Sequence, residues 1–196
     1  MSTLRSLVFV EALDIDKPRL LRPILIERVE SSLKQNQFFL FSTPTYVGKT
    51  SLFQLFNWDC VKLSWVGVSL RARRVPPIYA LLNAGIDFKK KDFSRLRAGR
   101  AYLFFLDSAE MYYGDKEFWK TLITDAPSWL PLNYRFIISA TDGFYTEEPA
   151  EFQTLPRFGM RDFLVNAEES RILLTLPKTG LPTPLRYYNR LLSVVV

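Results

Sequence analysis

Hydrophobic positions along the chain follow two patterns, helical spacing and short, mostly apolar runs. Between Pro18 and Lys34, Leu21, Leu25 and Val29 recur every four residues, which predicts an amphipathic helix. Apolar runs at 38–42, 61–69, 101–106 and 135–140 predict strands, several of them buried on both faces, and 171–176 is a further candidate. Helices are predicted at 51–57, 76–84 and 116–123. Alternating strands and helices indicate an α/β fold with three layers around a central, mostly parallel sheet.

This organisation suggests one globular domain with short appendages. We expect an N-terminal linker and helix over residues 1–36, a core over 37–176, and a tail or truncated element over 177–196. The last boundary rests on Gly180, Pro182 and Pro184, which are turn-prone.

The segment between the first strand and the next helix carries candidate chemistry. It fits the phosphate-loop pattern G-x-x-x-x-G-K-[ST], except that Thr43 replaces the first Gly. Its backbone N–H groups would face phosphate oxygens, Lys49 would bind the β and γ phosphates of ATP, and the Thr50 hydroxyl would ligate Mg²⁺. The strand–loop–helix context makes the match more specific than Gly-Lys-Thr alone. The candidate nucleotide-binding residues are Thr43, Pro44, Thr45, Tyr46, Val47, Gly48, Lys49, Thr50 and Ser51.

A second apolar strand ends in Asp107, the candidate magnesium-site carboxylate. It lies at the sheet edge where α/β proteins bind ligands. The intervening strand suggests the branch of P-loop proteins with a strand inserted between the two motifs, in which a water-activating Glu commonly follows the Asp. Here Ser108 follows, and Glu110 stands two residues on, so slow hydrolysis is expected. Ser139 and Thr141 are candidate sensors of the γ-phosphate, or hydroxyls that only satisfy a strand end.

At these residues the sequence resembles the P-loop NTPase domain of Crinkler effectors. The matching stretches are 44–52, 101–110 with Tyr113, Phe118 and Trp119, and 136–141. The resemblance covers about residues 18–176 and implies an ATPase domain related to the AAA and STAND groups, acting as a switch or effector module. It also implies action in a host cell, often in its nucleus. We find no leader motif of that family and no room for its nuclease half.

Composition excludes several classes of site. The chain has no histidine and one cysteine, Cys60, so imidazole bases, a His- or Cys-ligated zinc ion and an internal disulfide are excluded. No apolar run approaches the length of about 18 residues that spans a bilayer. We expect an intracellular protein without a membrane span.

Charge is unevenly distributed along the chain. The net charge is +6, yet residues 71–100 alone carry an excess of seven positive charges, and 141–170 an excess of five negative ones. This basic segment predicts a surface for nucleic acid or an acidic protein, or an ordinary solvated surface. The alternative function is therefore a non-enzymatic binding module on a degenerate P-loop fold; a small-molecule phosphotransferase and self-association are left open. The candidate nucleic-acid residues are Arg71, Arg73, Arg74, Lys89, Lys90 and Lys91.

Overall fold

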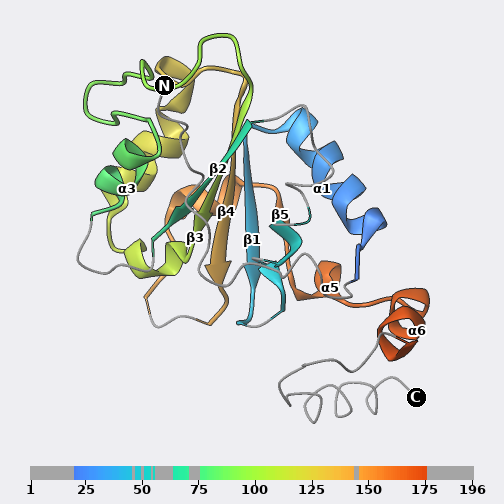
Figure 1. Cartoon of the computed structure of the whole chain (residues 1–196). Coiled ribbons are helices and arrows are strands. Elements are labelled where there is room, and N and C mark those ends of the chain that lie inside the picture. Colours follow the sequence, from blue (N-terminus) through green and yellow to red (C-terminus); the bar gives the residue numbers. More distant parts are fainter. Residues whose placement is uncertain are drawn as a thin grey trace. The chain divides into compact units, whose positions relative to one another are not determined.

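A five-stranded, wholly parallel sheet forms the centre of the molecule (Figure 1). The computed structural model describes residues 20–45, 47–49, 51–53, 55, 64–70, 76–143 and 146–175. The strand order is β2-β3-β4-β1-β5, so β4 lies between β1 and β3. The strands are β1 Phe38–Thr43, β2 Ser64–Ser69, β3 Tyr102–Asp107, β4 Tyr134–Thr141 and β5 Arg157–Phe158.

Both faces of the sheet are covered. In β1, Phe38 and Leu40 belong to one hydrophobic cluster, whereas Phe39 and Phe41 belong to another. Side chains alternate between the faces of a strand, so the two clusters are the two sides of the sheet. The three-layer α/β fold predicted from the apolar runs is therefore confirmed.

Helices of different lengths form the outer layers. α1 (Pro23–Gln35) lies on one side of the sheet and α3 (Pro77–Asn83) on the other (Figure 1). The remaining short elements are η1 Ala109–Tyr112, α4 Lys116–Trp119, η2 Lys120–Thr124, η3 Ala126–Ser128, η4 Ala150–Thr154 and α5 Met160–Phe163. α6 comprises Ala167–Thr175.

Two helix predictions need correction. The first helix begins at Pro23, not Pro18, because Arg22 adopts a left-handed conformation with φ 52° and Pro23 suits the first turn. The helix expected over 116–123 is α-helical only to Trp119 and continues as the π-helical turn η2.

The strand expected at 171–176 is wrong, because α6 occupies residues 167–175. Its start is fixed by reciprocal capping: the Glu169 N–H donates to Asn166 Oδ1 at 2.8 Å, and the Asn166 N–H donates to Glu169 Oε2 at 3.0 Å. Of the residues that the structure describes, those in 21–164 form one compact unit, and α6 belongs to a second. Among the described residues, no helix has the length and apolar character to cross a bilayer.

Candidate functional site

The loop that follows β1 is built around a backbone turn at Gly48. Thr43 ends β1 fully buried, and Pro44 and Thr45 are exposed. Gly48 has φ +90°, a conformation that L side chains rarely adopt, and a Cβ built on it would meet nothing within 4 Å. The backbone conformation, and not a lack of space, therefore explains the glycine at this position.

The Lys49 side chain folds back onto the first residues of the same loop. Its ammonium group donates to the carbonyl oxygen of Thr43 at 2.8 Å and to that of Pro44 at 3.0 Å. The side chain therefore runs back to the first residues of the loop, and its charge lies at the end of β1. Thr43 still contributes its carbonyl to this contact although it replaces the glycine of the motif.

The helix after the loop is fixed against β3. Its first turn begins with the bond from the Leu52 N–H to the Gly48 carbonyl at 2.8 Å. Leu52 and Phe53 are buried, and the Phe53 ring stacks on Phe105 with centroids 3.8 Å apart. Phe105 lies two residues before Asp107, so this packing sets the loop and the end of β3 relative to each other.

Asp107 is the last residue of β3 and is buried, with 5% exposure. Its carbonyl accepts from the Leu70 N–H at 2.9 Å. Ser108 follows in a left-handed conformation with φ 64° and is also buried. This turn reverses the chain at once into η1.

Glu110 reaches the end of the neighbouring strand. Its carboxylate accepts from the Thr141 hydroxyl at 2.9 Å and from the Thr141 N–H at 3.2 Å. Thr141 is in register with Thr43 of β1, where the loop begins. The structure thus brings together Glu110, Thr141 and the loop at one edge of the sheet.

Ser139 differs from Thr141. It is 1% exposed, and within the described part of the chain its hydroxyl has no hydrogen-bond partner. It is in register with Phe41, two positions before Thr43. A buried hydroxyl without a partner costs about 1–3 kcal/mol, so a ligand or water that supplies one would be bound favourably.

Asp142 is a site-edge residue that the sequence reasoning missed. Its N–H donates to the Thr43 carbonyl at 3.2 Å, and its carboxylate accepts from the Ser42 hydroxyl. Its position directly after β4 is a usable signal, because parallel strands end at a common edge.

Tyr113, Phe118 and Trp119, which carry part of the Crinkler resemblance, are buried core residues. The Trp119 ring nitrogen donates to the Tyr112 carbonyl at 2.8 Å. Burial raises the pKa of Tyr113, and the negative charges of Glu148, Glu110 and Asp142 raise it further.

Several predicted residues lie elsewhere. Lys89, Lys90 and Lys91 are exposed on the segment between α3 and β3. That segment precedes the amino end of β3, whereas the loop follows the carboxyl end of β1. Tyr46, Thr50, Arg71, Arg73 and Arg74 fall outside the described residues.

The described residues include no cluster of three or more Cys, Asp or Glu side chains able to hold a metal ion. A cation at Asp107 would therefore need oxygen ligands from phosphate and water, which is how Mg²⁺ is commonly bound beside nucleotides. A separate groove of about 370 Å³ runs along α1 and includes Arg28 and Phe158, away from this loop.

No protein-family model and no curated protein matches the sequence. Among solved structures, the Aeropyrum pernix Orc1 protein in complex with DNA is similar, with a TM-score of 0.52 and 14% identity. The match covers 91% of this chain and 56% of Orc1. The chain has the P-loop NTPase fold. The candidate P-loop, residues 43–51, follows β1, and β4 separates that strand from β3, which ends in Asp107.

Two further solved structures have weaker similarity. Caenorhabditis elegans PCH-2 has a TM-score of 0.42 at 13% identity, over 69% of this chain and 40% of PCH-2. The Walker-type ATPase PABY2304 of Pyrococcus abyssi has a TM-score of 0.39 at 16% identity, over 61% of this chain and 44% of that one. The chain spans about half the length of these neighbours or less.

Proposed function

We propose that this domain binds Mg²⁺–ATP at the P-loop. The observation that carries the proposal is the Lys49 ammonium, held on the Thr43 and Pro44 carbonyls beside the left-handed turn at Gly48. An ammonium at this position is a point charge for the β and γ phosphates, and the backbone of the loop and helix supplies N–H donors. Asp107 would hold the cation together with the Thr50 hydroxyl, and Ser139 would give its buried hydroxyl to the γ-phosphate or a bound water.

Titration calorimetry with ATP, ADP and GTP, each with Mg²⁺, tests this proposal. Lys49→Ala should weaken ATP binding at least tenfold, about 1.4 kcal/mol, because it removes the charge that faces the phosphates. The matched control is Lys34→Ala, which removes an exposed lysine from the last turn of α1 and should leave affinity unchanged. Equal ATP affinity in wild type and Lys49→Ala would reject the P-loop as the binding site.

Hydrolysis by this domain is proposed to be slow. Ser108 carries no carboxylate, and general-base assistance contributes about 10²–10⁴-fold to such reactions. Glu110 is the nearest alternative base, but its carboxylate is bonded to Thr141 through both oxygens. The domain would then act as a nucleotide-dependent switch or effector module instead of a fast ATPase.

The second candidate function is a non-enzymatic module that binds nucleic acid or a protein through 71–100. The departures from the motif at Thr43 and Ser108 favour it. If the wild-type chain shows no ATP binding in the calorimetric titration but binds nucleic acid or a protein, this candidate is selected.

The resemblance to Crinkler effectors remains part of the proposal. It implies a role within a host cell, and the nucleus is the compartment to examine. Expression of a fluorescent fusion in host cells tests this, because exclusion from the nucleus would reject the nuclear assignment.

A further inference from the structure

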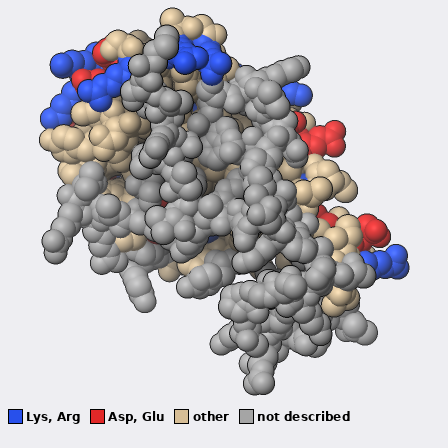
Figure 2. Space-filling model, viewed as in Figure 1, with Lys and Arg blue, Asp and Glu red and all other residues tan. Residues whose placement is uncertain are grey.

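The segment between α3 and β3, residues 84–100, is basic and exposed. It contains six basic residues and two acidic ones, and all six basic residues are exposed. We call these six the basic platform: Lys89, Lys90, Lys91, Arg95, Arg97 and Arg100. Figure 2 shows Lys and Arg side chains gathered at the upper end of the view, where Figure 1 places this segment.

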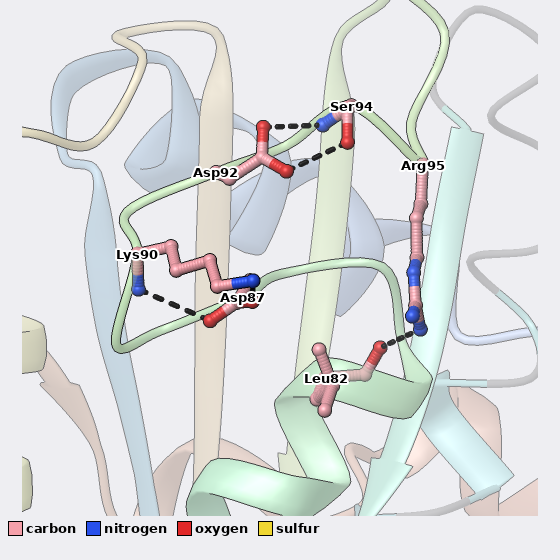
Figure 3. A network of polar contacts seen from close by, with 6 residues as sticks. All are labelled: Leu82, Asp87, Lys90, Asp92, Ser94 and Arg95. Carbon is pink, nitrogen blue, oxygen red and sulfur yellow. Dashed lines mark hydrogen bonds and ion pairs between the residues drawn. The ribbon is translucent and has the colours of Figure 1, made fainter.

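Local hydrogen bonds give the segment a defined shape (Figure 3). Asp87 and Asp92 form an antiparallel bridge with backbone bonds of 2.9 and 3.1 Å, and the three lysines lie at its tip. Asp87 accepts from the Lys90 N–H at 3.1 Å, and Asp92 accepts from the Ser94 hydroxyl at 2.6 Å and its N–H at 3.0 Å. Both acids of the segment are thus used to shape the turn that presents the lysines.

Arginine contacts connect this turn to the body of the domain. The Arg95 guanidinium donates to the Leu82 carbonyl at the end of α3 at 3.3 Å, as Figure 3 shows. The Arg97 N–H donates to the Tyr102 hydroxyl at 2.9 Å. Because a guanidinium carries five N–H donors, one bond to a carbonyl leaves Arg95 able to bind phosphate.

Aromatic packing beneath the platform holds it on the core. Phe88 lies 5.3 Å from Phe118 and 5.4 Å from Trp129 between ring centroids. Phe93 stacks on Trp129 at 5.8 Å and meets Tyr134 edge-on at 5.2 Å. The charges are therefore presented on an ordered surface, which lowers the entropy lost on binding.

The platform lies at the sheet edge opposite the P-loop. The Asn133 side chain, just before β4, donates to the Arg100 carbonyl at 2.5 Å, and Arg100 lies just before β3. The P-loop follows the other end of β1, and a strand of six residues is about 20 Å long. The platform is thus a separate site and takes no part in holding the nucleotide.

We propose that the basic platform binds the phosphate backbone of duplex DNA. Within 84–100 no large hydrophobic side chain is exposed; Phe88 is buried, and Phe93 is half-buried against Trp129 and Tyr134. Stacking on single-stranded bases requires exposed aromatic rings, and protein or membrane docking draws on apolar anchors. Leu132, which is 79% exposed near Asn133, is a single side chain and not an apolar patch.

Fluorescence anisotropy with a labelled 30-base-pair duplex tests the platform in the full chain. The variant K89Q/K90Q/K91Q should weaken binding at least tenfold at low salt and reduce the slope of log affinity against log salt by about 2–3, near 0.9 per lost phosphate contact. The control K34Q/K116Q/K120Q removes the same charge from three exposed lysines elsewhere and should change affinity less than threefold. Circular dichroism spectra and melting curves verify that both variants fold.

The outcomes separate the alternatives. Equal weakening by the two triple variants would show a general charge effect and overturn the proposal, as would wild type failing to bind the duplex. Binding of a polyglutamate peptide without duplex binding would assign the surface to an acidic protein and likewise overturn it. Lys49→Ala should leave duplex affinity unchanged, so the result of this test is independent of the ATP proposal.

Discussion

At the scale of single residues, the backbone conformation decides which groups the Glu110 and Ser139 side chains contact, and the sequence shows no sign of that conformation. Glu110 lies three residues after Asp107, so whether its side chain can contact the site depends on the conformation of the turn between them. Ser108 makes that turn in a left-handed conformation, which is uncommon for serine and has no sequence signal. The types of the candidate residues were thus predictable from the motif, but the Glu110–Thr141 contact was not.

The hydrolysis proposal makes Glu110 the residue to test. Glu110→Gln keeps the side-chain size but removes the carboxylate. Because both carboxylate oxygens of Glu110 already accept from Thr141, slow ATP turnover should stay close to the wild-type rate, and a fall of about 10²–10⁴-fold would show that Glu110 is a working general base. Glu117→Gln, on the exposed surface of α4, is the matched control. Steady-state phosphate release measures both variants.

At the scale of elements, continuous apolar runs predicted the central strands well because both faces of the sheet are covered. β5 was missed because it has only two residues, Arg157–Phe158. The 171–176 error arose because Ile172, Leu173 and Leu174 suggest a strand, whereas the Asn166–Glu169 capping pair starts a helix. Capping chemistry outweighed a short apolar run there.

The packing of the segment that carries the basic platform includes a close approach of the Leu96 side chain to Gly85. A Cβ at Gly85, where φ is +100°, would lie 2.6 Å from Leu96 Cδ2, whereas one at Gly99, where φ is +76°, meets nothing within 4 Å. Both alanine variants incur a left-handed cost of about 1–2 kcal/mol. Only Gly85→Ala adds an overpacking cost of about 1–3 kcal/mol.

Urea denaturation should therefore show a larger loss of unfolding free energy for Gly85→Ala than for Gly99→Ala. Equal losses would mean that Leu96 moves aside without cost.

At the scale of the whole molecule, strand–helix alternation predicted the layers. The strand expected at 61–69, between the two motifs in the sequence, suggested the branch of P-loop proteins in which another strand lies between the two motif strands, and β4 occupies that place. The basic segment leads into β3 and therefore lies at the amino ends of the parallel strands, opposite to the P-loop, but its local shape and packing were not predictable from the sequence. Contacts from Arg97 to Tyr102 and from Asn133 to Arg100 place it there.

Alkaline stability is a property of the whole fold that Tyr113 should influence. Its pKa is raised above the ordinary value of 10.0, chiefly by burial, so the folded state keeps the proton more tightly than the unfolded chain. The stabilisation is complete below pH 10 and is lost as pH rises further. Tyr113→Phe should flatten the fall in unfolding free energy above pH 10, whereas Tyr79→Phe, on an exposed ring, should not.

Circular dichroism unfolding curves across this pH range measure the effect. Parallel pH profiles for wild type and Tyr113→Phe would mean that other groups control alkaline unfolding.

The opposite placement of the P-loop and the basic platform has a mechanical consequence. β4 runs between the two edges, from Tyr134 beside the platform to Thr141 beside the P-loop, and most of it is buried. β4 pairs with both β1 and β3 over Phe136–Ile138, so neither side of this stretch is free to bend away from the sheet. A shift of Thr141 is therefore expected to move Tyr134 as well, because the doubly paired stretch lies between them.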